Sequence, residues 1–350
     1  MSHPLLVYGA TGYSGRLIVD AALAQGVRPI LGGRDARKLA GMAERLGLEY
    51  RVARLEEPDQ LDAALRDVRV VLHAAGPFSQ TSRPMADACL RSGTHYLDIA
   101  AEIAVIEALA QRDRAARERG VMLMPGVGFD VVPSDCLAAH VARRLPGARR
   151  LALAISGLAF VTRGSAKTFM EAADSGAVRR DGVIVGVRAG TLRREFDFGA
   201  GPRPVLNLSW GDVASAYYTT GIPDIEVYVE TTPALEAVAV ANQWFGWFLG
   251  TGPWQAWLKG HADLLPEGPS AAERAARRVV VVAEATDGRG GRAVARLATP
   301  EVYTVTGMVA PAVARRVVDG DLEPGFQTPA RVYGSDFVLS VPGVAREDVA

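Results

Sequence analysis

The chain has little cysteine and no excess of charge of either sign, and both features limit its function. Its 350 residues include two cysteines, and 39 acidic residues balance 39 basic ones. Cys89 and Cys136 offer neither a disulfide framework nor the ligand spacing of a metal site, so we expect no metal and a reducing cytoplasm. Because nucleic-acid binding normally requires a basic excess, the balanced charge argues against a nucleic-acid partner.

Signals for secretion and for membrane insertion are missing as well. No leader of basic and then apolar residues opens the sequence, which predicts no secretion and a cytoplasmic location. Residues 234–258 hold four of the five tryptophans but are interrupted by Gly250, Gly252 and Pro253, whereas a membrane span needs about 20 unbroken apolar residues. Three interpretations stay open: a dimer interface, which we favour, the wall of an apolar substrate tunnel, and shallow membrane contact. We expect a homodimer that uses part of this stretch, with the rest bordering the substrate pocket.

The first third of the chain alternates apolar strands with helical patterns. Strands are predicted at 5–8, 29–32, 49–52, 68–74, 94–98 and 121–124, with helices beginning near Gly12, Ala36, Pro58, Ser82 and Ile103. Such alternation predicts βαβ units in a Rossmann-type, doubly wound parallel sheet.

After residue 125 the pattern becomes strand-rich, and no internal repeat is present. Strands are predicted at 151–156, 182–187, 192–196, 205–208, 225–229, 279–286 and 291–297, with a hairpin turn at 287–290 and a last helix at 302–319. With 350 residues the chain is long enough for two domains. The fold class is therefore α/β, with a second α+β domain built on a mostly antiparallel sheet.

The most informative segment follows the first predicted strand. The apolar run 5–8 leads to three glycines at three-residue intervals and then to the start of a helix. The first glycine permits a tight turn, the second lets the backbone approach phosphates, and the third lets the helix pack closely on the strand. A helix N-terminus favours an anion. The segment is therefore predicted to bind a dinucleotide through Gly9, Thr11, Gly12, Tyr13, Ser14 and Gly15.

The second and fourth strands indicate how the rest of the dinucleotide is held. An NAD enzyme usually places a carboxylate at the end of the second strand, where this chain has Arg34, with Lys38 one helical turn later. A guanidinium binds a 2′-phosphate through charge-assisted hydrogen bonds, so we predict NADP(H), with Asp35 capping the next helix. After the fourth strand, a turn of small residues leaves room for the cofactor's ribose and nicotinamide. That turn consists of Ala75, Gly76, Pro77 and Phe78.

Six short segments together resemble the saccharopine dehydrogenase-like oxidoreductases, and most closely the branch called trans-acting enoyl reductases. These segments are 9–15, 32–34, 75–78, 93–98, 128–135 and 328–330. The resemblance implies an NADP-binding domain at 1–125, a substrate and dimerisation domain at 126–303, and a C-terminal segment, 304–350, that returns to the first domain. One position departs from the family, because Ala101 stands before Glu102 where a glycine is common.

Catalysis requires groups near the carboxyl ends of the parallel strands, where sites form in such sheets. Reduction of a conjugated enoyl thioester needs donors for the carbonyl oxygen and an acid for the α-carbon. The loops after the fourth to sixth strands bring polar side chains to this edge. They are His73, Ser79, Gln80, Tyr96, Asp98, Glu102, Asp130 and Asp135. From them we select Tyr96 and Asp130, and from the second domain Lys167 and Tyr217, as candidate catalytic residues.

Each candidate also has a structural interpretation. Tyr96 fits a core aromatic with a satisfied hydroxyl, Asp98 and Asp135 fit helix or turn caps, and His73 fits a satisfied core histidine. The function predicted is NADPH-dependent reduction of a C=C bond in an apolar enoyl or polyketide-like substrate. Two alternatives stay open: reduction of a C=N bond, for which Arg163, Arg179 and Arg180 would bind substrate carboxylates, and a non-catalytic NADP-sensing protein.

Overall fold

The computed structural model describes residues 3–158, 176–188, 190–233, 235–236 and 268–349. The predicted catalytic Lys167 and nearly all of the aromatic-rich stretch 234–258 lie outside the described residues. The chain divides into two compact units, one made of Met1–Val132 and Val302–Gly334 and the other of Pro133–Glu301 and Ser335–Ala350. The expected C-terminal segment, 304–350, is thus divided between the units, because its last strand joins the sheet of the second unit.

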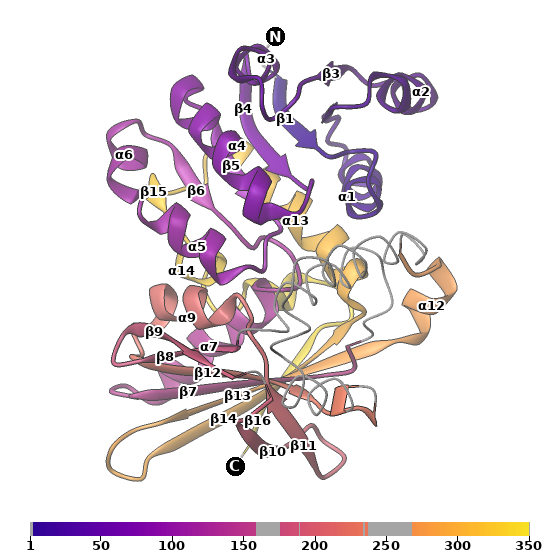
Figure 1. Cartoon of the computed structure of the whole chain (residues 1–350). Helices are drawn as coiled ribbons and strands as arrows, with labels where there is room; N and C mark the ends of the chain where they lie inside the picture. Colours follow the sequence, from indigo (N-terminus) through magenta and orange to yellow (C-terminus); the bar gives the residue numbers. More distant parts are fainter. Residues whose placement is uncertain (1–2, 159–175, 189, 234, 237–267, 350) are drawn as a thin grey trace, which may run out of the picture. The chain divides into compact units, whose positions relative to one another are not determined.

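The first unit is built on a seven-stranded sheet in the order β15-β6-β5-β4-β1-β2-β3, and every pairing in it is parallel (Figure 1). The predicted Rossmann-type sheet is therefore confirmed. Its strands are β1 (His3–Tyr8), β2 (Ile30–Gly33), β3 (Tyr50–Val52), β4 (Val68–His73), β5 (His95–Asp98), β6 (Met122–Met124) and β15 (Gly325–Phe326). The two-residue β15 was not predicted, because so short a strand has no periodicity of its own.

The helices of this unit follow the predicted order closely. They are α1 (Tyr13–Ala24), α2 (Ala36–Leu46), α3 (Pro58–Ala64), α4 (Phe78–Ser92), α5 (Ile103–Ala110), α6 (Asp113–Glu118), α13 (Val302–Asp319) and α14 (Pro329–Tyr333). The fourth begins at Phe78 rather than near Ser82, because Pro77 occupies the N-cap. α1 packs against α13, where Gly307 lies beside Leu17. Strand side chains such as Val7 and Leu72 are fully buried beneath the helices.

In its described residues the second unit is built on a nine-stranded, mostly antiparallel sheet, as predicted. The order is β10-β11-β12-β7-β13-β14-β16, with β8 pairing with β12 and with β9, and only β12 and β7 are parallel among the described pairs. The strands are β7 (Arg150–Ser156), β8 (Gly176–Arg180), β9 (Val183–Val187), β10 (Arg193–Asp197), β11 (Pro202–Asn207), β12 (Asp224–Glu230), β13 (Arg278–Thr286), β14 (Arg292–Pro300) and β16 (Ala345–Val349). The helical segments in the described part of this unit are α7 (Val132–Arg144), α9 (Asp212–Thr220), α12 (Ala271–Ala276) and the 3-10 helix η1 (Phe337–Ser340).

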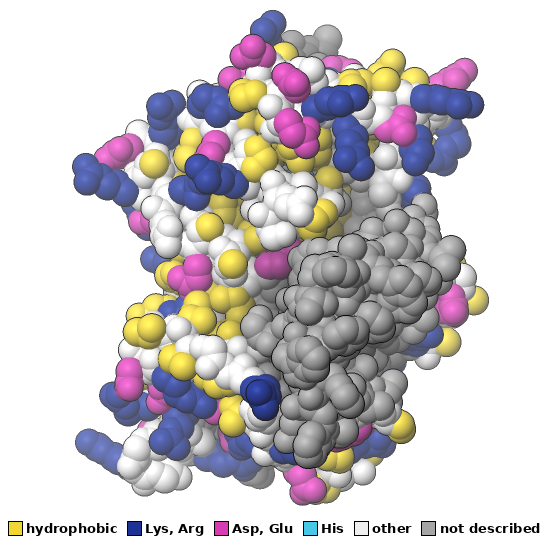
Figure 2. Space-filling model, viewed as in Figure 1, with side chains coloured by type: hydrophobic (Ala, Val, Ile, Leu, Met, Phe, Trp, Pro, Cys, Tyr) yellow, Lys and Arg dark blue, Asp and Glu magenta, His cyan; other side chains and the backbone are white. Residues whose placement is uncertain are grey.

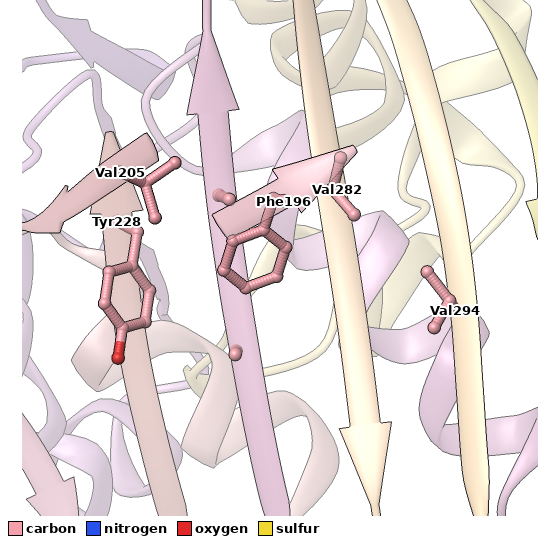
Figure 3. Close-up of a cluster of buried hydrophobic side chains, with 7 residues drawn as sticks. Phe196, Val205, Tyr228, Val282 and Val294 are labelled. Atoms are coloured by element: carbon pink, nitrogen blue, oxygen red, sulfur yellow. The ribbon is translucent and has the colours of Figure 1, made fainter. Parts of the chain in front are cut away.

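One face of this sheet carries a hydrophobic cluster around Phe196 (Figure 3). The Phe196 ring of β10 lies 5.8 Å from the Tyr228 ring of β12, and Val282 of β13 and Val294 of β14 belong to the same cluster. Arg194 lies 4.7 Å above the Phe196 ring and pairs with Glu284 of β13. Apolar packing and ion pairs therefore both hold β10 against the strands that it faces.

Two further features of the structure are the distribution of charge on its surface and the apolar character of its helices. On the face that Figure 2 shows, basic and acidic side chains are interspersed over both units rather than separated by sign. Among the described helices, none combines the length and the apolar character needed to cross a bilayer.

Candidate functional site

The first glycine of the predicted phosphate loop is required by the fold itself. Gly9 has φ of +87°, and a Cβ atom there would lie 2.9 Å from backbone and side-chain atoms of Ala74 and Ala75. Its N–H donates to the Gly32 carbonyl at 2.9 Å. This glycine therefore sits in a turn that is tied to both β2 and β4, where L side chains are disfavoured.

The other two glycines, Gly12 and Gly15, differ in how much space surrounds them. A Cβ atom on Gly15 would lie 2.1 Å from the Gly9 carbonyl oxygen, so Gly15 lets α1 pack directly against the turn. A Cβ atom on Gly12 would meet only that same oxygen, at 3.3 Å, within 4 Å in the described part of the chain. Gly12 is the exposed N-cap of α1 and adopts an extended conformation. Among the described residues, packing thus restricts position 12 through one contact only, whereas a ligand in front of the helix would account for a glycine there.

The neighbours of these glycines hold the loop in place. Arg16 donates to the Thr11 carbonyl oxygen at 2.7 Å, and the Tyr13 ring contacts the Tyr303 ring of α13 edge-on at 5.0 Å. The first N–H groups of a helix have no acceptor within the helix itself, and α1 begins at Tyr13, directly after the glycine loop. The loop therefore presents donors and a positive helix end, which fits the phosphates of a dinucleotide.

The end of β2 carries the basic residues that the sequence singled out. Asp35 caps α2 as predicted, accepting from the Lys38 N–H at 3.0 Å, and the Lys38 ammonium lies 4.0 Å from the same carboxylate. Arg34 is exposed and forms no ion pair or hydrogen bond with the described residues. Burial and the charge of Glu56 raise the pKa of Tyr8 to about 12, and the charge of Arg34 opposes this rise. Arg34 therefore lies near the carboxyl ends of β1 and β2, with its guanidinium available to a ligand.

The turn after β4 lies directly beside the glycine loop. The Ala74 N–H donates to the Tyr8 carbonyl at 2.8 Å, and the Ala75 side chain is among the atoms closest to Gly9. The Gly76–Pro77 peptide bond is cis, and the Thr81 hydroxyl holds the turn by donating to the Ala75 carbonyl at 2.7 Å. The structure therefore brings together the two predicted cofactor-binding segments.

Asp98, at the end of β5, organises the next loops. Its carboxylate accepts from the Tyr96 hydroxyl at 2.6 Å, the Ala100 N–H at 2.9 Å and the Gly126 N–H at 3.0 Å. Burial raises its pKa to about 6, although these hydrogen bonds oppose the rise. Tyr96 is fully buried and its hydroxyl proton points at Asp98. This arrangement is the one expected of a core aromatic, and a catalytic role for Tyr96 stays a prediction.

Glu102 and Asp130 form a second acidic group at the same edge of the sheet. The Glu102 carboxylate accepts from the Ala101 N–H at 2.9 Å and from the Phe78 N–H at the start of α4. Burial raises its pKa above the usual value, and the Asp98 charge adds to this effect. Burial, together with the charge of Glu102, raises the pKa of Asp130 to about 7. Both groups therefore hold protons more readily than ordinary carboxyls do.

The loop that carries Asp130 is fixed to α13. The Phe129 N–H donates to the Thr306 hydroxyl at 3.0 Å, and Gly128 packs against the Thr306 side chain. The sequence predicts a catalytic role for Asp130, whereas it places Glu102 only among the polar residues of the loops. The sequence does not reveal that Glu102 lies close to Phe78, because the two residues are 24 positions apart. The position of Glu102 just after β5 is the one feature of the sequence that points to the site.

His73, the last residue of β4, is expected to be a core histidine with satisfied hydrogen bonds, and only part of this expectation holds. It is fully buried, but neither ring nitrogen has a hydrogen-bond partner in the described part of the chain. Its ring lies 5.4 Å from the Phe78 ring and 5.5 Å from the Tyr8 ring. Burial lowers its pKa to about 3, so the ring is neutral. The histidine therefore belongs to the core, as expected, but it is not satisfied there.

The candidates of the second unit are occupied by contacts within that unit. The Arg179 guanidinium lies 4.2 Å above the Tyr217 ring and donates to the Val213 and Gly182 carbonyls. Arg180 pairs with Glu226. The arginines proposed to bind substrate carboxylates are therefore engaged inside the protein, and Arg163 lies outside the described residues. Catalysis by Tyr217 stays a prediction.

Two further charged features of this unit also have partners. Asp135 lies in the first turn of α7, as expected, and accepts from the Thr219 hydroxyl of α9 at 2.5 Å. A cavity of about 520 Å³ lies on the sheet beside Ala152, and its walls include the ion pairs Arg180–Glu226 and Arg194–Glu284. Paired charges of this kind give the cavity no evident preference for a ligand.

Comparison with known proteins agrees with this geometry. Residues 5–124 match the saccharopine dehydrogenase NADP binding domain. The matched residues lie within the first unit, which consists of Met1–Val132 and Val302–Gly334. A trans-acting enoyl reductase of Mycobacterium leprae is 32% identical over 149 residues, which are 40% of this chain and 36% of that protein. The chain thus matches little more than a third of the length of that relative.

Two solved structures share the fold over nearly the whole chain. Apo saccharopine dehydrogenase (L-Glu forming) from Saccharomyces cerevisiae has a TM-score of 0.66 at 13% identity, covering 99% of this chain and 100% of that one. Homospermidine synthase from Legionella pneumophila, in complex with NAD, has a TM-score of 0.68 at 7% identity, covering 100% and 92%. At such identities the likeness shows the fold alone. The chain therefore has an NAD(P)-binding domain, matched over residues 5–124, and a second unit built on a mixed sheet.

Proposed function

We propose that the protein is an NADPH-dependent oxidoreductase that reduces a C=C bond in an apolar enoyl or polyketide-like substrate. The observation that carries the cofactor assignment is the open face of Gly12 at the N-terminus of α1, beside two glycines that the fold itself requires. The choice of C=C chemistry rests on the match to trans-acting enoyl reductases, which covers the N-terminal part of the chain.

The residues around the loop fit a bound dinucleotide. The N–H groups at the start of α1 would hold the pyrophosphate, and the turn at Gly76 would border the nicotinamide half. Arg34, exposed at the end of β2, would bind a 2′-phosphate. When bound, the cofactor supplies hydride. The proton that completes the reduction comes from an acid of the protein or from solvent.

Asp130 and Glu102 are the groups best suited to supply a proton. Loss of hydration around the partly buried Asp130 and the charge of Glu102 raise its pKa to about 7, so much of it is protonated at neutral pH. A general acid works best when its pKa lies near the working pH. Because the two carboxyls interact, they titrate as a pair rather than as independent groups. We assign Asp130 as the proton donor, with Glu102 keeping its pKa high.

Tyr96 and Asp98 support this assignment indirectly. The buried Asp98 carboxylate joins the end of β5 to Gly126, at the start of the loop that carries Asp130. Its hydrogen bond from Tyr96 keeps that carboxylate oriented. These residues position the loop, whereas Asp130 exchanges the proton.

The experiment combines cofactor binding with turnover. NADPH and NADH are titrated into the protein, and NADPH oxidation is then followed with enoyl thioesters and, separately, with pairs of a keto acid and an amine. Tight NADPH binding and turnover of an enoyl thioester are expected, with Asp130→Asn binding NADPH normally but turning over at least tenfold more slowly. Turnover only with the keto acid and amine pairs would replace C=C by C=N reduction. Binding without any turnover would favour the NADP-sensing alternative.

A further inference from the structure

Strand β9 has one edge that pairs with no other described strand of the second unit. Among the described strands it pairs only with β8. Its sequence from Val183 to Val187 contains no charge and no proline, and the Val183 and Val185 side chains are 63% and 42% exposed. Natural edge strands usually carry lysine, proline or a bulge, which prevent pairing with another chain. The exposed valines therefore need an explanation.

The hairpin geometry shows which backbone groups face outward. A two-residue turn at Asp181 and Gly182, both with positive φ, joins β8 to β9, and Arg180 pairs with Val183 across it. In such a hairpin the two residues next to the turn form a hydrogen-bonded pair. Along the two strands, hydrogen-bonded pairs then alternate with pairs whose N–H and C=O groups point away from the partner strand. The N–H and C=O groups of Ile184 and Gly186 therefore point away from β8. The side chains of Val183, Val185 and Val187 share one face of the strand.

We propose that β9 pairs antiparallel with β9 of a second copy of this chain, about a twofold axis at Val185. In this register the outward groups of Ile184 meet those of Gly186 in the other copy, and both such pairs form hydrogen bonds. Val185 faces its own counterpart, and Val183 faces Val187 of the second copy. The two copies then share one continuous sheet.

The sequence favours a second copy over an unrelated strand. A twofold interface requires a surface that is complementary to itself, and the run Val-Ile-Val-Gly-Val reads almost the same in both directions around Val185. The larger Ile184 meets the smaller Gly186. At each end, exposed Arg188 of one copy comes opposite Gly182 of the other, next to exposed Asp181, so opposite charges meet. No like charges face each other across the axis.

A pair of five-residue strands buries less area than a standard interface of about 1,600 Å². The expected dimer therefore dissociates on dilution, and its mass must be measured over a range of concentrations. Sedimentation velocity on the full chain is suited to this. Val185→Lys places two ammonium groups opposite each other at the axis. Val52→Lys is the matched control, because Val52 is 41% exposed on β3, the edge strand of the other sheet.

The expected result is a dimer for the unaltered chain and for Val52→Lys, with the dissociation constant of Val185→Lys raised at least tenfold. Any of three results would overturn the proposal. The unaltered chain could be monomeric, Val185→Lys could be as dimeric as the control, or both lysine variants could lose dimerisation equally.

Disulfide cross-linking tests the register itself. Cys89 and Cys136 are buried, so a new surface cysteine is the reactive one. Val185→Cys brings two sulfurs together in a non-hydrogen-bonded pair, where Cα atoms lie about 4.5 Å apart. Val183→Cys is the control, since two copies of position 183 would be four residues out of register, about 13 Å apart. Cross-linking of Val185→Cys alone is expected, and cross-linking of both or neither would contradict the twofold axis at Val185.

Discussion

Separate replacement of Gly12 and Gly15 tests two different roles. Gly12 is expected to leave room for a ligand, whereas Gly15 is expected to be required for packing of the fold. A Cβ atom at position 15 would lie 2.1 Å from the Gly9 carbonyl oxygen and 2.9 Å from Ala10, which are backbone atoms that cannot turn aside. Overpacking of this kind costs about 3 kcal/mol or more, which lowers the midpoint of thermal unfolding by about 6–12 °C. We therefore expect Gly15→Ala to be clearly destabilised without nucleotide.

Gly12→Val is expected to behave in the opposite way. Among the described residues its new Cβ atom would meet one atom, the Gly9 oxygen at 3.3 Å, which must shift slightly, so we expect a cost to folding of about 1 kcal/mol. The branched side chain would instead fill the space in front of the helix N-terminus. If phosphates occupy that space, NADPH affinity falls at least a hundredfold, about 2.7 kcal/mol.

Two measurements on the same samples separate these effects. Thermal unfolding is followed by circular dichroism without nucleotide, and NADPH binding is followed by titration calorimetry at a temperature where all variants are folded. If Gly12→Val binds NADPH as tightly as the unaltered protein does, the phosphates lie elsewhere. Gly15→Ala that unfolds at the original temperature would refute the packing argument.

Three further predictions concern charged and polar groups. Arg34→Ala should lose most of the preference for NADPH over NADH, about one to two decades of affinity because a charge-assisted pair contributes roughly 1.5–3 kcal/mol, and binding titrations with both nucleotides check this. The folded-state pKa of Asp130 is raised to about 7, so its burial lowers stability as pH rises from about 4 to 7; urea unfolding across this range should show a smaller fall for Asp130→Asn. The folded-state pKa of His73 is lowered to about 3, so stability should be lost as pH falls from about 6.5 to 3, and His73→Phe should remove this loss while keeping the ring packing.

Much of the first unit could be predicted because local sequence and global fold agree there. Apolar runs such as 68–74 end at small residues, and Asp35 caps its helix, so boundaries were found within a few residues. The glycine loop and the Gly76 turn were also recognisable, because each has a local signature. Their adjacency depends on the parallel pairing of β1 and β4, which the βαβ pattern implies.

The parts that could not be predicted depend on distant contacts. β16 is held by pairing with the distant strand β14, and β8, which pairs with β9, joins the rest of the described sheet only through its Arg179, which pairs with Ile225 of β12. The acidic pair Glu102 and Asp130 is formed by two loops, and only the folded chain shows that burial raises both pKa values. The missing hydrogen bonds of His73 could not be inferred either, because a sequence does not reveal which buried groups find partners.

Isotope transfer from the cofactor to the substrate tests the central claim most directly. The protein is incubated with NADPH that carries deuterium at the transferable position and with an enoyl thioester, and the product is examined by mass spectrometry and NMR. The account predicts a saturated thioester with deuterium at the β-carbon, formed more slowly by Arg34→Ala at limiting NADPH and by Asp130→Asn at saturating NADPH. An enoyl thioester recovered unlabelled and unreduced, from protein shown to bind NADPH, would contradict it.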